Sequence, residues 1–298
     1  MPAFAPLSGR ELALRTRFVF ATRGGGASIE VVALRRPELV VRRTRYDRLI
    51  VDERVLTRAF PVIAPPSRLF SLALIEGRIR FHLEDRVLEV APGDVVLLRP
   101  SMTSRACFER AFFVDLEWTT DDAARLEAPR LVGRAARAEL ASFADSLADE
   151  TLPHRELLAQ GFACFANAGV PLGPLDAAAL RGGPSVREER IARAIQGQLR
   201  ELGTAASSLN LAEVAELSPR QLQRVVEDLA ARYGINAGNW RDMRNRWRIQ
   251  IGAVLLSVPE LTLSEIAAEV GYASPAALAR AFAHAGLPPP SELRAALT

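Results

Sequence analysis

The chain has 298 residues, a length that suggests about two domains, and 49% hydrophobic and 24% charged residues are typical of a soluble globular protein. No apolar run approaches the roughly 20 residues of a membrane-spanning helix and no secretory signal is visible, so we expect a cytoplasmic protein without membrane contact. Two cysteines and three histidines exclude a disulfide framework and argue against a histidine-built metal site. The 38 basic residues are all arginine, but a net charge of +3 does not by itself indicate nucleic-acid binding.

The first part of the chain, to about Trp118, has the pattern of short β-strands. Apolar and polar residues alternate from Arg78 to Glu84, the period-two pattern of a half-buried strand. Glu76-Gly77 and Pro92-Gly93-Asp94 are turn signals between such runs. Several short strands at this spacing predict a β-sandwich or barrel. The expected strands cover residues 28–34, 39–45, 69–74, 78–84, 87–90, 95–98 and 112–118.

Beyond Trp118 the hydrophobic period becomes helical. Apolar residues recur at i, i+3, i+4 and i+7 from Leu140 to Leu147, and a second helix is expected at 156–168. This stripe is either a dimerisation face or buried against the chain's own β part. Residues 169–185 are rich in glycine and proline and predict a linker. We therefore expect an α+β multidomain chain whose parts are residues 1–125, 126–185 and 186–298.

Two segments of the last part share one pattern, Leu211 to Arg224 and Ile266 to Phe282. Each has an apolar residue followed by Ala, a turn position, and then Ser-Pro. The small Ala lets a second helix cross closely, and Ser caps that helix with Pro in its first turn. The turn favours glycine because it needs a positive φ; Gly271 fills it in the second segment and Glu216 in the first. Two helix-turn-helix units are predicted, with a long helix between them at about 240–256.

These features resemble the AraC/XylS family of transcription regulators. The resemblance covers about 186–297, and its strongest part is Arg248-Ile249-x-x-Gly252, Ile266-Ala267-x-x-Val270-Gly271-Tyr272 and Pro290-x-x-Leu293-Arg294. It implies a cupin-like N-terminal β-barrel at 1–125 that binds an effector and mediates dimerisation, a helical dimerisation and linker segment at 126–185, and an all-α double helix-turn-helix domain at 186–298. The function implied is a ligand-responsive, dimeric, sequence-specific DNA-binding regulator. The implied partners are promoter DNA, RNA polymerase, an unidentified small effector and a second copy of the chain, with no cofactor or metal.

The candidate DNA contacts lie on the two recognition helices of this frame. Arginine can pair with guanine and glutamine with adenine in the major groove, and a serine at a helix N-terminus can donate to a phosphate. We expect the first recognition helix, from Pro219 to about Leu229, to read sequence, with Arg224 holding a phosphate or pairing with Glu213. The alanine-rich second helix is expected to hold the backbone. The alternative is a solvated helix face. The candidates are Ser218, Arg220, Gln221, Gln223, Arg224, Ser274, Ala276 and Arg280.

Two further groups of arginines have more ordinary interpretations. Arg241, Arg244, Arg246 and Arg248 lie near Trp240 and Trp247, where we expect the tryptophans in the core and Arg248 in a structural role. The N-terminal group is expected to be a solvated face, with an anionic-effector site or a second DNA contact as the alternatives. Its members are Arg35, Arg36, Arg42, Arg43, Arg45 and Arg48.

Two other classes of function stay open. A cupin-type enzyme with a helical tail is disfavoured, because the sequence has no Ser/His/Asp order, phosphate-binding loop or metal-ligand set. His82 is the one histidine of the β segment, whereas a metal-binding cupin needs several, so a catalytic metal cupin is disfavoured. We expect no enzyme activity. An interaction protein with degenerate helix-turn-helix units is the second alternative, suggested by the alanine-rich second recognition helix.

Overall fold

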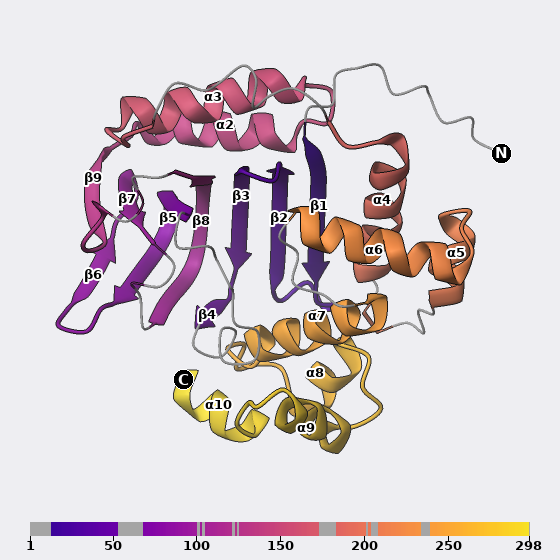
Figure 1. The fold of residues 1–298 in the computed structure, drawn as a ribbon. Helices are drawn as coiled ribbons and strands as arrows, with labels where there is room; N and C mark the ends of the chain where they lie inside the picture. The colour runs from indigo at the N-terminus through magenta and orange to yellow at the C-terminus, as the bar shows by residue number, and fades with distance from the viewer. Residues whose placement is uncertain are drawn as a thin grey trace.

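In the part of the chain that the structure describes, one antiparallel sheet has helices on both faces. The computed structural model describes residues 13–52, 68–99, 102, 105–120, 123, 125–172, 183–200, 202–203, 208–233 and 239–297. Within these ranges the β part comes first and the all-helical part last, as predicted (Figure 1). Most of the predicted linker, residues 173–182, lies outside the described residues.

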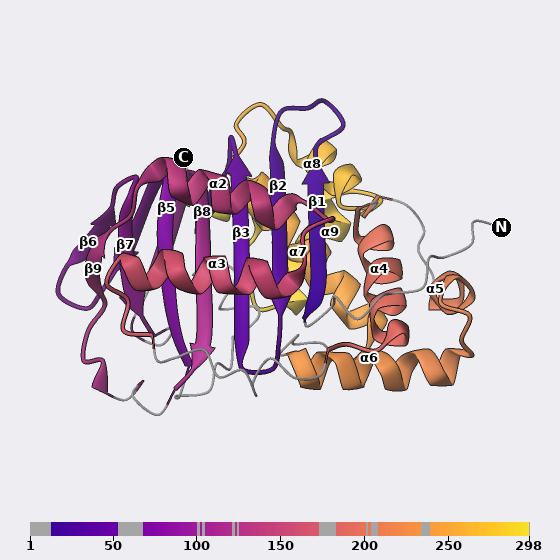
Figure 2. The same cartoon turned by 90° about the horizontal axis from the view of Figure 1, so that it is seen from above.

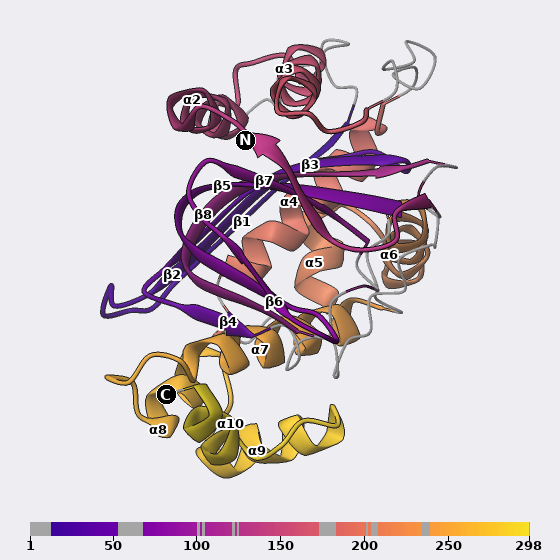
Figure 3. The ribbon, with the colours of Figure 1, turned by 90° about the vertical axis from the view of Figure 1, so that its left-hand side faces the viewer.

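The sheet has nine strands in the described part of the chain, and it is strongly curved (Figure 3). Its path is β1-β2-β3-β8-β5-β7-β9, with β4 paired to β8 and β6 to β5. The end strands β1 and β9 do not pair with each other there, so the predicted cupin-like barrel is an open, curved sheet. The strands are β1 Leu14–Ala21, β2 Ser28–Arg35, β3 Leu39–Asp47, β4 Ile50–Asp52, β5 Arg68–His82, β6 Val87–Val90, β7 Asp94–Leu98, β8 Arg105–Thr119 and β9 Arg130–Arg134.

Most predicted strands are confirmed, but the turn predicted at Glu76-Gly77 is wrong. One strand, β5, runs through this point and pairs with β8 on both sides of a register shift. Gly77 has a φ of 84°, and a Cβ there would overlap the carbonyl oxygen of Arg110. The glycine therefore permits a bulge in a long strand rather than a reversal of the chain.

Helices α2 (Arg137–Ala148) and α3 (His154–Asn167) cover the convex face of the sheet (Figures 2 and 3). The apolar stripe from Leu140 to Leu147 is buried there against strand residues such as Val41 and Leu116. A Cβ on Gly161 would press on the ring of Phe143, so the glycine lets α3 lie close. The stripe is thus part of the chain's own core and not a free dimerisation face.

The concave face of the sheet packs against the C-terminal helices. Phe18 and Phe20 of β1 and Leu72 of β5 belong to the same buried cluster as Ile195 and Val254 of the helical part. The two parts therefore share one apolar core, whose burial contributes roughly 25 cal/mol for each Å² of apolar surface removed from water.

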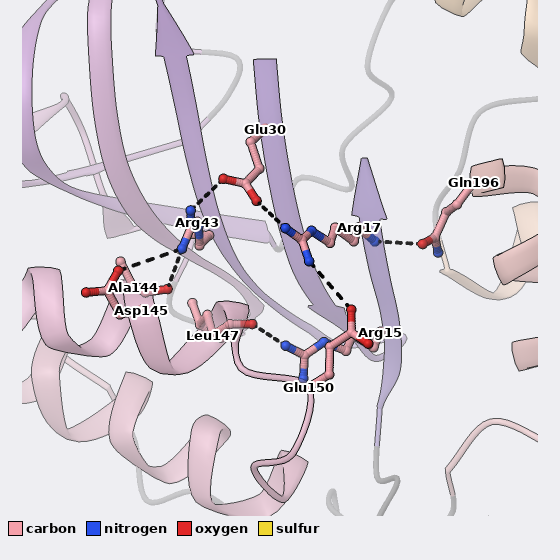
Figure 4. A network of polar contacts seen from close by, with 9 residues as sticks. All are labelled: Arg15, Arg17, Glu30, Arg43, Ala144, Asp145, Leu147, Glu150 and Gln196. Carbon is pink, nitrogen blue, oxygen red and sulfur yellow. Dashed lines mark hydrogen bonds and ion pairs between the residues drawn. The ribbon is translucent and has the colours of Figure 1, made fainter. Parts of the chain in front are cut away.

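Arg42 and Arg43 of the N-terminal group are paired within the fold and Arg36 is buried, so the solvated-face interpretation is wrong for these three residues. Arg42 binds Asp115 at 2.8 Å and Glu117 at 3.2 Å. Arg43 binds Glu30 at 2.6 Å and donates to the carbonyl oxygen of Ala144 at 3.1 Å (Figure 4). Burial raises the pKa of Asp115 to about 6, although the Arg42 guanidinium opposes this shift.

We predict that Glu30→Gln destabilises the fold by about 2–3 kcal/mol, because it removes the charge facing a buried guanidinium. Glu30 binds both Arg17, at 3.1 Å, and Arg43, whose side chain is only 9% exposed. The matched control is Asp145→Asn, since Asp145 is 81% exposed and 3.9 Å from Arg43; it should cost under about 0.5 kcal/mol. Urea unfolding followed by circular dichroism measures both, and equal losses would contradict the prediction.

Candidate nucleic-acid interface

The first helix-turn-helix unit is built by α4 (Val186–Arg200), α5 (Ser208–Val214) and α6 (Pro219–Tyr233). Leu211 and Ala212 of α5 are buried together with Leu222 and Val226 of α6. The small side chain of Ala212 allows this close crossing, as the sequence pattern predicts. Helix α6 continues beyond residue 229, where the expected recognition helix ended.

The second unit is built by α7 (Trp240–Leu255), α8 (Leu263–Glu269), α9 (Pro275–His284) and α10 (Pro290–Leu297). Thr262 and Glu265 form a capping box at the start of α8. Ser274 caps α9 by accepting the backbone N–H of Ala277 at 3.2 Å, and Pro275 stands in the first turn. The Ser-Pro helix start predicted from the sequence is thus confirmed here.

The turns of the two units have the same hydrogen bonds. The N–H of Leu217 donates to the carbonyl of Ala212 at 2.8 Å, and the N–H of Tyr272 donates to that of Ala267 at 2.7 Å. Gly271 has a φ of 78° and Glu216 a φ of 55°, so both adopt the left-handed conformation. The glutamate therefore takes a backbone conformation that costs a non-glycine residue free energy. Its carboxylate also binds Arg190 of α4 at 2.7 Å.

Substitutions at the two turns should have opposite signs. Glu216→Gly should stabilise by up to about 1 kcal/mol, because relief of the left-handed strain exceeds the loss of an exposed ion pair. Gly271→Ala should destabilise by about 2 kcal/mol or more, because a Cβ there would also overlap the carbonyl oxygen of Leu202. Thermal and urea unfolding measure both changes.

Gly197→Ala is the control for removal of a glycine, since this position in α4 has open space around it; it should stabilise by about 0.5–1 kcal/mol. Destabilisation by Glu216→Gly would show that the pair with Arg190 outweighs the backbone strain.

The candidate side chains of α6 are exposed, but two of them already have partners. The side-chain oxygen Oε1 of Gln221 accepts the backbone N–H of Ser218 at 3.0 Å, while the Ser218 hydroxyl accepts the backbone N–H of Gln221 at 3.3 Å. Ser218 and Gln221 therefore form a capping box, which the spacing Ser-x-x-Gln could have revealed. Gln223 donates to Glu227 at 3.0 Å. Arg220 and Arg224, one turn apart, have no side-chain partner in the part of the chain that the structure describes, so the predicted alternative of an Arg224–Glu213 pair does not occur.

Helix α9 presents little hydrogen-bonding chemistry. Ala276 and Arg280 are exposed, Ser274 is half-buried at its cap, and Leu278 and Phe282 point into the core. The structure thus places the candidates on two separate helices, with the charged ones on α6 and only Arg280 on α9 (Figure 1).

Arg248 and Trp240 of α7 have structural roles. Arg248 donates to the carbonyl oxygens of Val270 and Gly271 and lies over the ring of Tyr272, 3.9 Å from its centroid. Burial lowers the pKa of Arg248 and raises that of Tyr272. Trp240 is buried. The structural interpretation of Arg248 and of these core positions is confirmed.

The three histidines lie far apart in the fold, at the end of β5, the start of α3 and the end of α9. In the ranges that the structure covers, no group of three or more His, Cys, Asp or Glu side chains is placed to hold a metal ion. Over the same ranges, no helix combines the length and apolar character of a membrane span.

Comparison with known proteins identifies the C-terminal part of the chain. A family model described as a helix-turn-helix domain matches residues 211–296. A comparison with curated proteins found no match.

Solved structures with similarity include the AraC-like transcriptional activator CuxR, at 16% identity over 78% of this chain and 85% of that one, with a TM-score of 0.37. The C-terminal domain of AraT, a response regulator from Geobacillus stearothermophilus, is 26% identical over 38% of this chain and 88% of its own, with a TM-score of 0.33. ToxT from Vibrio cholerae is 12% identical over 86% of this chain and 98% of its own, with a TM-score of 0.32. Because these TM-scores are low, the assignment rests on the family model and on the geometry of α5–α9.

Proposed function

We propose that this chain is a DNA-binding transcription regulator with an AraC-type helix-turn-helix domain at residues 211–296. We further propose that it reads its operator mainly with α6. The observation that carries the proposal is the pair of equivalent turns, Ala212 to Leu217 and Ala267 to Tyr272, in one chain. Each turn presents a helix that begins at a capped Ser-Pro. Of these two helices, α6 displays two exposed guanidinium groups without partners among the described residues, whereas Arg280 is the one arginine of α9.

Arg220 and Arg224 are the proposed reading residues. Side chains at i and i+4 lie on the same side of a helix, so both can face one groove. A guanidinium can bind the O6 and N7 atoms of guanine or a phosphate. Ser218 and Gln221 support them by capping α6, and Gln223 is held by Glu227.

Helix α9 is proposed to contact the DNA backbone. Ser274 and the start of the helix would lie against a phosphate, and Arg280 would bind a second one. Ala276 can contact a thymine methyl group but donates no hydrogen bond to a base.

We propose that the β part senses a small effector and that the regulator acts as a homodimer on repeated half-sites in the cytoplasm, without catalytic activity, and with RNA polymerase as a further partner. The proposed parts remain residues 1–125, 126–185 and 186–298. The shared core of Phe18 and Ile195 supports an effect of an effector on the helices. Such an effect requires that the effector binds two arrangements of the chain with different affinities.

The first experiment is selection of binding sites from a random duplex pool with the full chain, followed by titration of Arg220→Ala and Arg224→Ala. Each variant should lose about 1–3 kcal/mol of binding free energy where its arginine reads a base, with relaxed preference at that base pair. A phosphate contact would instead weaken all sequences and lower the salt slope by about one.

The control variants are Arg130→Ala and Arg155→Ala, made singly; each removes one exposed arginine, of β9 or of α3, and changes the net charge as much as one α6 variant does. Their affinities should equal that of the wild type. If the α6 variants also bind like the wild type, α6 is not the reading helix. Weak binding to every duplex, with no sequence selected, would favour an interaction protein with degenerate units.

A further inference from the structure

The first helix-turn-helix unit is attached to the edge of the sheet. Helix α4 packs along β1, and its Ile195 and Leu199 are buried in one cluster with Phe18. The side-chain oxygen of Gln196 accepts the backbone N–H of Arg17 at 3.0 Å (Figure 4). This N–H lies on the outer side of β1, which has no neighbouring strand in the described sheet.

The second unit is attached to the same edge and to β4. Trp247 of α7 stacks on Phe18, with 4.3 Å between the ring centroids. Ser257, which follows α7, accepts the N–H of Ile50 at 3.0 Å. Glu269, at the end of α8, accepts the N–H of Arg23 in the β1–β2 hairpin at 3.0 Å.

On the β side, the groups that contact the two helical units are held in place by the sheet. Three of the four contacts use backbone N–H groups, which move only if the strand or hairpin moves. The side chain of Arg17 is also held, by Glu30 at 3.1 Å and Glu150 at 3.7 Å (Figure 4).

The attachment to the sheet leaves the candidate DNA-contact side chains of α6 and α9 exposed. Arg220, Arg224, Ala276 and Arg280 are all exposed although both units are attached to the β part. The attachment is therefore compatible with DNA binding, and its effect falls on the placement of α6 relative to α9.

We infer that β1 and its hairpin form a splint that fixes the distance and orientation between α6 and α9. The β part would thereby specify the spacing between the two DNA contacts made by one chain, base reading by α6 and backbone binding by α9. The inference rests on the proposed function. It assigns a positioning role to Gln196 and Glu269, one from each unit, which act through their backbone partners on β1 and the hairpin.

The test compares spacing tolerance between the wild type and Gln196→Ala/Glu269→Ala. A site selected by the wild-type chain receives one extra base pair between its two contact segments, which rotates one segment by about 35° relative to the other. The wild type should lose about tenfold or more in affinity, as for a poorly matched site. The double variant should lose less than about threefold, because its two units are no longer held in one orientation.

The control is Gln160→Ala/Glu260→Ala, which removes the same two residue types from exposed positions on α3 and after α7. It should show the wild-type penalty. Phe18→Leu is the second test variant, since it removes the ring stack with Trp247 but retains an apolar side chain. It should also reduce the loss of affinity caused by the extra base pair. Circular dichroism and thermal unfolding establish that each protein is folded.

The outcomes separate the two proposals. Selection of no sequence by the wild type would overturn the proposed function and the splint together. A selected site with an undiminished spacing penalty in folded variants would overturn the splint alone. Tighter binding of the double variant to the parent site would also overturn it, because the sheet would then restrain the helices rather than position them for DNA. A smaller penalty in both variants supports it.

Discussion

The outer edge of β1 is the constraint on which the rest of the structure depends. An edge strand presents backbone groups that must be paired or covered, and in the described sheet β1 has a strand neighbour only on the side of β2. Helix α4 covers the other side, where Gln196 pairs with the N–H of Arg17. The open sheet leaves the edge of β1 unpaired by a strand, and α4 covers that edge. A barrel closed at β1 would leave α4 no strand edge to cover.

The shared core has a consequence for regulation. Phe18, Phe20 and Leu72 on the concave face are buried together with Ile195 and Val254 of the helices. Neither part can lose this contact without exposing apolar surface to water. In the proposed regulation, a change in the curvature of the sheet would reach α4 and α7 through this packing.

Local chemistry was predictable from the sequence, whereas pairing over long distances was not. Ser274-Pro275, Gly271 and Pro92-Gly93-Asp94 act on their own neighbours, so their patterns predicted a helix start and two turns. By contrast, nothing near Gly77 shows that β8 runs beside both halves of β5, which turns an expected reversal into a bulge. The pairing of Arg42 with Asp115 across two strands was hidden for the same reason. Strand β1 was missed, although its edge organises the fold.

In the candidate site, a local hydrogen bond limits what one candidate side chain can offer to DNA. Gln221 has a side chain suited to adenine, but its oxygen already serves the capping box with Ser218. Reading a base with both groups of that amide would require the cap to open, and loss of such a cap costs about 1 kcal/mol. In the proposed function, base reading by α6 therefore falls mainly to Arg220 and Arg224.

Helix α9, with Ala276 exposed and Arg280 as its charged candidate, can discriminate few bases directly. Contacts to the backbone carry no sequence information by themselves, but they carry spacing information when the helix that makes them is rigidly placed. A weakly reading second helix and a firm attachment of both units to β1 are thus complementary features. If α9 contacts DNA as proposed, its few base-reading groups leave its contribution to specificity to depend mainly on where the sheet holds it.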